Sequence, residues 1–374
     1  MAAPGDKFFI HDKLAIPAKH HESFEQLWET KWKPHATMGV YPFMFGTASD
    51  FASILASMKA SQMREPYNWD TYAETFFPTA QSLFSTATTA EAAGEIEKAS
   101  EYYLRASAVY RIARFPAPAA PSSAKPATEN APVPTVIIFT GLDGYRTELA
   151  VWMEGFRAAG IATVVLEIPG TGDCPANVSD PTSPDRLYSS LFDWVDAQPR
   201  LDTKKTAIWA FSTGGYYAIR VAHTHPERLA GVVALGGGCH HMFDRVWLDN
   251  VNHLEYPFDL ADTLAYKWGY GNDVEAFKRE AGAKFSLLND GTLDKPVCAR
   301  LLLVNGTEDE IFPIDDYYLA LQHGAPKEAR FVPGKKHMGE PDSFFLIIKW
   351  LYQLFGVKGN VGKFMATLPF KPKY

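Results

Sequence analysis

The chain divides into two parts with different patterns of hydrophobic and polar positions. From about residue 19 to 114 apolar side chains recur every three and four residues, which predicts amphipathic helices. After a stretch rich in proline and alanine, the pattern changes to short β-branched runs that alternate with helix-like segments. We therefore predict a helical N-terminal domain over residues 1–118, a linker over 119–134 and a second domain over 135–374.

The second domain alternates strand-like and helix-like runs. This alternation is typical of βαβ units, with a mostly parallel sheet that is covered by helices on both faces. The strand-like runs are 136–139, 163–166, 207–210, 232–235, 301–304 and 329–332. The fourth and fifth runs are far apart, and the aromatic-rich residues between them predict a helical cap, inserted over 239–296 at the carboxyl ends of the strands. The predicted class is α/β.

The composition narrows the classes of function. The chain has 36 Lys and Arg against 43 Asp and Glu, a formal charge of −7, and no block of basic residues, so we expect no nucleic-acid partner. No stretch approaches the roughly 18 consecutive apolar residues of a spanning helix, and the first residues lack the pattern of a signal peptide. We expect a cytoplasmic, intracellular protein without a membrane partner.

The cysteines suggest neither a disulfide framework nor a metal site. Cys174, Cys239 and Cys298 are an odd number at wide spacing, and they form no CxxC pair. Adjacent histidines at 240 and 241 are also a poor metal site, because neighbouring side chains diverge. We expect no metal and no cofactor.

A serine stands between a predicted strand and a predicted helix. Segment 210–215 reads AFSTGG, with small residues two positions on either side of Ser212. A sharp strand-to-helix turn needs small residues there and lifts the hydroxyl above the sheet, as in the nucleophile elbow of α/β-hydrolases. Ala210 stands in place of the first glycine of the usual GxSxG pattern. We predict the α/β-hydrolase fold with Ser212 as nucleophile; the alternative is that Ser212 only caps the helix.

A serine nucleophile needs a base, and the base needs an acid to orient it. In this fold both follow the nucleophile along the chain, after later strands. The strand-like run at 301–304 leads into GTEDEIFP, in which Asp309 is our choice of acid and Glu308 and Glu310 are the alternatives. The last run leads into PGKKHMG, which makes His337 the predicted general base.

The loop that follows the first strand-like run reads TGLDGY, where hydrolases carry an oxyanion loop. We predict that the backbone N–H groups of Leu142 and Thr213 form the oxyanion hole. The glycines at 236–238 would let the backbone approach a ligand next to two histidines. The residues expected to bind substrate are Asp143, Tyr145, Phe211, His240 and His241.

Four segments together resemble fungal α/β-hydrolases that accompany polyketide pathways. They read TGLDGY at 140–145, FSTGGY at 211–216, GGGCHHMFD at 236–244 and LEYPFD at 254–259. The nearest type is that of the "yellowish-green" pigment hydrolases, which shorten a heptaketide naphthopyrone in melanin synthesis. These proteins have a helical N-terminal domain and are similar to bacterial C–C hydrolases such as dihydroxypseudooxynicotine hydrolase.

The resemblance implies a Ser-His-Asp enzyme, with Ser212, His337 and Asp309 at the triad positions. Its expected partner is a small aromatic polyketide, and its expected reaction is hydrolysis of a C–C bond in a β-dicarbonyl, a retro-Claisen chain shortening. The same triad would equally serve an esterase, a lactonase or an acyltransferase that releases a polyketide. In such proteins the helical domain covers the site and often mediates dimerisation, so we expect a homodimer.

Overall fold

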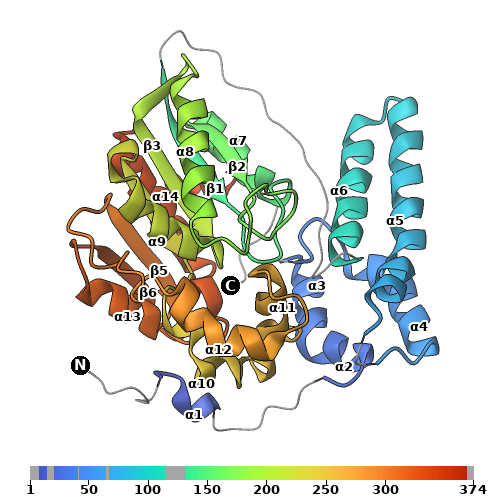
Figure 1. Ribbon diagram of the computed structural model, residues 1–374. Coiled ribbons are helices and arrows are strands. Elements are labelled where there is room, and N and C mark those ends of the chain that lie inside the picture. Colours follow the sequence, from blue (N-terminus) through green and yellow to red (C-terminus); the bar gives the residue numbers. More distant parts are fainter. Residues whose placement is uncertain (1–7, 15–20, 41, 65–66, 114–131, 369–374) are drawn as a thin grey trace. The chain divides into compact units, whose positions relative to one another are not determined.

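The computed structural model (Figure 1) divides into two compact units, formed by residues 1–18 with 119–368 and by residues 19–118 with 369–374. It describes residues 8–14, 21–40, 42–64, 67–113 and 132–368. The predicted linker therefore lies, up to residue 131, outside the described part. Within that part no helix is long and apolar enough to cross a membrane.

A six-stranded parallel sheet forms the centre of the larger unit, in the order β2-β1-β3-β4-β5-β6. The strands are β1 (Val133–Phe139), β2 (Ala162–Leu166), β3 (Leu201–Phe211), β4 (Gly231–Leu235), β5 (Leu301–Gly306) and β6 (Glu328–Val332). Each contains one of the predicted strand-like runs. Every residue of β4 and β5 is buried, which fits their almost unbroken apolar sequence. The predicted α/β-hydrolase fold is confirmed.

Helices cover both faces of this sheet (Figure 1). On one face Tyr188 of α8 (Ser183–Asp196) stacks on Phe139 of β1, beside α9 (Gly214–Thr224). On the other face Phe344 of α14 (Asp342–Phe355) meets the Trp209 ring of β3, and Phe156 of α7 (Met153–Ala158) packs there too. α13 (Asp315–Gln322) lies between β5 and β6 in the chain, and α15 (Val361–Met365) packs on α7. The sheet core is thus aromatic on both sides.

The insertion between β4 and β5 is helical, as predicted. Its helices are α10 (Arg245–Leu248), α11 (Leu260–Lys267) and α12 (Val274–Phe285). Their rings form a cluster in which Trp268 contacts Phe243, Phe277 and Phe285 and also reaches Tyr216 of α9. Aromatic packing therefore holds the insertion against the helix that follows Ser212.

The smaller unit is helical, as the three- and four-residue spacing predicts. Its helices are α2 (Phe24–Leu27), α3 (Lys33–Met38), α4 (Ala52–Ala60), α5 (Trp69–Ala92) and α6 (Ile96–Ala113), with a π-helical turn at Trp28–Trp32. α5 and α6 form a long helical hairpin (Figure 1), in which Tyr72 O–H donates to the carbonyl of Ile112 at 2.9 Å. Asp50 is buried and forms an ion pair with Arg105 at 2.6 Å.

The first described residues, 8–14, pack on the sheet-containing unit and are called here the N-terminal strap. Phe8 is 8% exposed, and its ring meets the edges of His241 and Trp247 at centroid distances of 5.7 and 5.3 Å. The short helix α1 (His11–Leu14) brings Lys13 Nζ within 2.9 Å of Glu308 and 3.2 Å of Glu310. The sequence pattern had grouped these residues with the helical domain 1–118.

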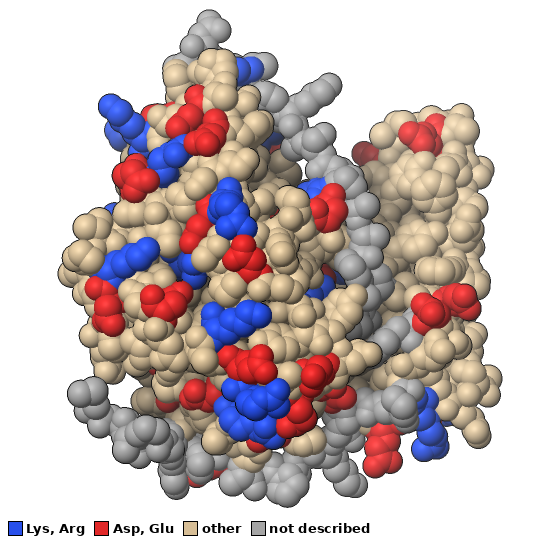
Figure 2. Space-filling model, viewed as in Figure 1, with Lys and Arg blue, Asp and Glu red and all other residues tan. Residues whose placement is uncertain are grey.

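Charged side chains on the surface are mixed in sign. Figure 2 shows acidic and basic residues interspersed over the face in view. Many of them are paired; Arg245, for example, contacts Asp249 at 2.7 Å and Glu275 at 2.9 Å, and Lys278 contacts Asp249 at 3.1 Å. Exposed pairs of this kind contribute little stability.

Candidate active site

Ser212 lies in the turn between β3 and α9, in a left-handed conformation with φ of 52°. Its N–H donates to the carbonyl of Leu235 at 2.7 Å. The second and third residues after it must be small, because a Cβ on Gly214 would collide with the carbonyl of Thr140, and one on Gly215 would lie 2.8 Å from the Cα of Gly237. A strained serine between a strand and a helix is the geometry of a nucleophile elbow.

Ser212, His337 and Asp309 form one chain of hydrogen bonds. His337 Nε2 lies 2.8 Å from Ser212 Oγ, and His337 Nδ1 lies 2.9 Å from Asp309 Oδ2. Asp309 is fully buried, and its Oδ1 accepts the N–H groups of Ile311 at 2.7 Å and Phe312 at 3.1 Å. A buried carboxylate held in this way fixes the tautomer that places a proton on Nδ1 and leaves Nε2 free to accept.

The two alternative acids point elsewhere. Glu308 Oε2 and Glu310 Oε1 both contact Lys13 of the strap, and Glu310 Oε2 contacts Lys336 at 2.8 Å. Of the three adjacent acids, the structure therefore brings only Asp309 to His337.

Asn305 connects the loop of the acid to the loop of the base. Its Nδ2 donates to Asp309 Oδ2 at 2.7 Å, and its Oδ1 accepts the N–H of Met338 at 2.9 Å. The two loops also touch directly, because a Cβ on Gly306 would collide with the carbonyl of Lys336. Sequence reasoning gave Asn305 no role beyond the end of a strand.

The insertion places a carboxylate beside the base. Glu255 Oε2 accepts the backbone N–H of His337 at 3.2 Å. Burial, followed by the charge of Asp309, raises the pKa of Glu255. Burial alone would lower the pKa of His337, but the charge and hydrogen bond of Asp309, with the charge of Glu255, raise it overall. The two carboxylates therefore stabilise the positively charged form of the imidazole. Glu255 was not among the predicted residues, since only the segment LEYPFD around it was noted.

The predicted oxyanion loop lies against the nucleophile. A Cβ on Gly141 would be 3.2 Å from the Cβ of Ser212, so the residues after β1 pass close to the hydroxyl. Leu142 is buried, and its carbonyl accepts the hydroxyl of Thr171 at 3.0 Å. Thr213 is buried at the start of α9. Thr213 thus follows Ser212 directly, and Leu142 follows the glycine that lies against it.

Three of the predicted substrate-binding residues lie in this loop or at the end of β3. Asp143 and Tyr145 belong to the loop, and Phe211 directly precedes Ser212. Asp143 Oδ2 accepts the hydroxyl of Tyr256 at 3.2 Å, so the insertion contacts the loop. Tyr145 and Phe211 are both buried. The Phe211 ring lies 4.6 Å from that of Trp209, within the aromatic core of the sheet.

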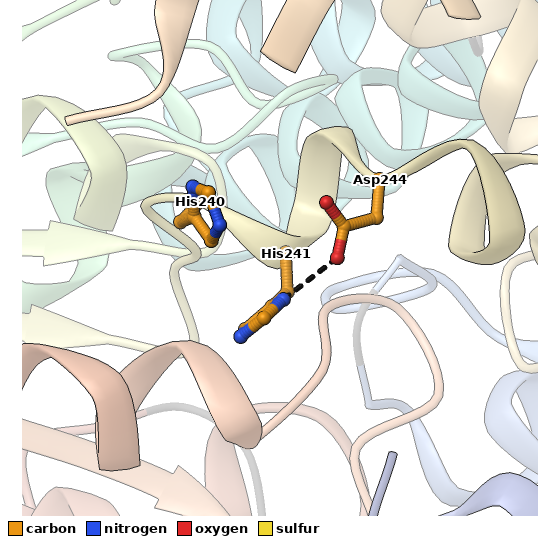
Figure 3. Close-up of side chains that lie close together, drawn as sticks. All are labelled: His240, His241 and Asp244. Carbon is orange, nitrogen blue, oxygen red and sulfur yellow. Dashed lines mark hydrogen bonds and ion pairs between the residues drawn. The ribbon is translucent and has the colours of Figure 1, made fainter. Parts of the chain in front are cut away.

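The other two predicted binding residues, His240 and His241, have partners outside the triad. His240 Nδ1 lies 2.6 Å from Ser286 Oγ, and His241 Nδ1 lies 2.7 Å from Asp244 Oδ2 (Figure 3). Their backbone N–H groups both donate to Asp316 at 2.7 Å. The structure therefore holds this pair through a buried carboxylate, apart from the hydrogen-bond chain of Ser212.

Within the described residues, His240, His241 and Asp244 form a cluster that could hold a metal ion. Their ligand atoms lie within 4.8 Å of one another (Figure 3). Burial by itself lowers the pKa of His241, but the hydrogen bond to Asp244 and the charge of Asp316 raise it overall. Burial lowers the pKa of His240, whose ring therefore favours its neutral form more than free histidine does.

The chain is similar in sequence to a family of esterases. The family model described as "Esterase FrsA-like" matches residues 124–353. The esterase FrsA of Photobacterium profundum is 27% identical over 224 residues, which are 59% of this chain and 52% of that protein. The esterase FrsA of Serratia proteamaculans is 24% identical over 56% of this chain and 50% of its own length. The chain spans about half the length of the curated relatives it matches.

Solved structures share the fold. A 2,6-dihydroxy-pseudo-oxynicotine hydrolase superposes with a TM-score of 0.63 at 17% identity, over 88% of this chain and 97% of that one. AbyA5 superposes with a TM-score of 0.56 at 19% identity, over 77% and 91% of the two chains. At these identities the likeness concerns the α/β-hydrolase fold alone.

Proposed function

The chain belongs to the FrsA-like esterase family, and on that basis we propose that it is a serine hydrolase with Ser212, His337 and Asp309 as its triad. The observation that carries the proposal is the unbroken hydrogen-bond chain from Ser212 Oγ through His337 to the buried Asp309 carboxylate. An N-cap serine needs no such partners, and a binding module needs no strained elbow.

The geometry supports acyl transfer through a covalent intermediate. His337 Nε2 takes the proton of Ser212 as Oγ attacks a carbonyl carbon, and Asp309 stabilises the resulting imidazolium. We place the oxyanion between the backbone N–H groups of Thr213, next to the nucleophile, and of Leu142, next to Gly141, which lies against Ser212. Glu255 adds a second negative charge beside His337, which favours the protonated state that this step requires.

For the substrate we propose a β-dicarbonyl of an aromatic polyketide. Attack on its ketone gives a tetrahedral oxyanion, whose collapse breaks the bond to the carbon between the two carbonyls. The electron pair leaves on that carbon as an enolate, which takes the proton held by His337. The acyl group stays on Ser212 until a water molecule, deprotonated by His337, releases it as a carboxylic acid. Support for this class comes from the four segments that resemble the polyketide hydrolases.

Hydrolysis of an ester or lactone is the second candidate. The family match favours it, because the matching relatives are named esterases. The same residues would act in the same order, with an alkoxide as leaving group in place of the enolate.

The test compares the wild-type protein with Ser212→Ala on two substrates, a naphthopyrone with a β-dicarbonyl side chain and 4-nitrophenyl acetate. Products are followed by mass. Ser82→Ala, at an exposed position of α5, is the matched control. We expect loss of an acyl fragment from the naphthopyrone with the wild type and the control but not with Ser212→Ala. Cleavage of the ester alone would favour the second candidate, and turnover that persists in Ser212→Ala would contradict the triad.

A further inference from the structure

Lys267, the last residue of α11, is a buried cation without a counter-ion. It is 4% exposed, and within the described residues no carboxylate oxygen lies within 4.0 Å of its Nζ. The other two buried cations of the described chain are hydrogen-bonded: Arg220 contacts Asp185 and Asp290, and Arg111 donates to two backbone carbonyls. An unpaired buried ammonium is expensive, and a fold gains nothing from it by itself.

Lys267 lies at the end of a helix that meets the loops around the nucleophile. α11 ends directly on the loop that follows β2, because a Cβ on Gly170 would collide with the carbonyl of Lys267. The hydroxyl of Thr171, in the same loop, holds Leu142. The charge of Asp143 acts on Lys267 from beyond ion-pair distance. Lys267 therefore belongs to the same corner of the site as the residues that follow β1.

That corner adjoins the triad on two sides. Gly141, two residues before Asp143, faces Ser212 directly. On the other side, adjacent residues of the insertion reach both partners: Glu255 accepts the N–H of His337, and Tyr256 donates to Asp143. A group held by Lys267, on the side of Asp143, would consequently lie near the carbonyl that Ser212 attacks.

We propose that Lys267 binds an acidic oxygen of the substrate, either a carboxylate or an ionised enol or phenol, at a subsite beside the Tyr256–Asp143 hydrogen bond. The inference rests on the proposed hydrolase function and specifies its substrate class. An anionic oxygen supplies the partner that the ammonium lacks, and such charge-assisted hydrogen bonds are short and strong in a site sheltered from water. Burial lowers the pKa of Lys267 to about 8, so the side chain is still mostly charged at neutral pH.

The test measures binding to the Ser212→Ala protein, so that no turnover interferes. Three probes share one ring system: 2-naphthoate carries a carboxylate, 2-naphthol a phenol and methyl 2-naphthoate neither. Their dissociation constants are compared in the Ser212→Ala background alone, with Lys267→Met, with Lys267→Arg and with Lys349→Met, a control at an exposed position of α14. Lys267→Gln replaces Lys267→Met if circular dichroism shows that the latter does not fold.

We expect at least one acidic probe to bind more tightly than the methyl ester, and Lys267→Met to remove about ten- to a hundredfold of that advantage. Lys267→Arg should keep part of this advantage in affinity, and Lys349→Met should keep all of it. A preference for naphthoate identifies a carboxylate site, and one for naphthol identifies an enol or phenol site. The proposal is overturned if neither acidic probe binds more tightly than the ester, or if the advantage survives in Lys267→Met.

This experiment and the test of Ser212 can fail separately. Loss of the acidic preference leaves Ser212-dependent turnover untouched, so the hydrolase proposal would stand. Conversely, a protein without Ser212-dependent turnover could still bind the acidic probes through Lys267.

Discussion

Replacing Lys267 by methionine should stabilise the protein, because it removes a buried charge that no carboxylate neutralises. Burial lowers the pKa of Lys267 from 10.5 to about 8, although the charge of Asp143 opposes the shift. At about 1.4 kcal/mol per pKa unit, the difference corresponds to about 3 kcal/mol. We therefore expect the free energy of unfolding at pH 7 to rise by up to about 3 kcal/mol, less any strain from repacking.

The pH dependence of this gain follows from the direction of the shift. The unfolded chain holds the proton more tightly than the folded one, so the penalty is fully present below about pH 8. It disappears as the pH rises from about 8 towards 10.5, where both states lose the proton. The stability of the wild type should therefore approach that of the variant at high pH.

Urea denaturation followed by circular dichroism measures both effects, with the wild type and Lys267→Met compared at pH 7 and pH 9.5. Lys349→Met is the control, and a change at its exposed position should stay within about 0.5 kcal/mol. A variant less stable than the wild type at pH 7 would show that Lys267 has a partner in the folded protein. A gain of equal size at both pH values would show that the charge of Lys267 is not its cause. Greater stability together with weaker binding of acidic probes would be the trade-off expected of a functional residue.

Three other predictions test the site and its support. Glu255→Gln removes a negative charge that raises the pKa of His337, so the acidic limb of the pH profile of kcat/KM should move to lower pH. An unmoved limb would show that Glu255 does not affect the pKa of His337. Asp309→Asn should lower kcat by about 10³- to 10⁴-fold, whereas Glu308→Gln should leave kcat close to that of the wild type. A larger loss of kcat in Glu308→Gln than in Asp309→Asn would show that Asp309 is not the acid of the triad. Phe8→Ala should lower the free energy of unfolding by about 3 kcal/mol in urea, whereas an unchanged midpoint would show that the strap does not pack as described.

The sheet and the elbow could be predicted because their signals are local. Each strand is a short β-branched run between turn residues, and burial on both faces leaves such runs almost uninterrupted. The prediction that Ser212 is the nucleophile depends on two small neighbours and on the strand before it. These signals all lie within a few residues of Ser212. Asp309 and His337 could be chosen because the order of the motif follows the order of the strands. The choice among three adjacent acids needed the structure.

The missed features depend on contacts between distant segments. Glu255 meets His337 across 82 positions, from a segment of the insertion between two helices. Lys267 ends an amphipathic helix and resembles any surface lysine until its burial is known. The roles of His240 and His241 depended on where a glycine-rich loop turns, and a buried carboxylate on α13, 75 or 76 positions away, sets that turn.

The N-terminal strap has a consequence for the order in which the protein can be completed during synthesis. Lys13 and its partner Glu308 are 295 positions apart. At about 5 to 20 residues per second, a ribosome needs about 15 to 60 s to make the intervening chain. Through that interval Lys13 has no partner, and Phe8 has none until His241 and Trp247 have been made. The strap is thus made early and docks on the larger unit late. A fusion partner attached ahead of the strap would therefore disturb a late step of folding.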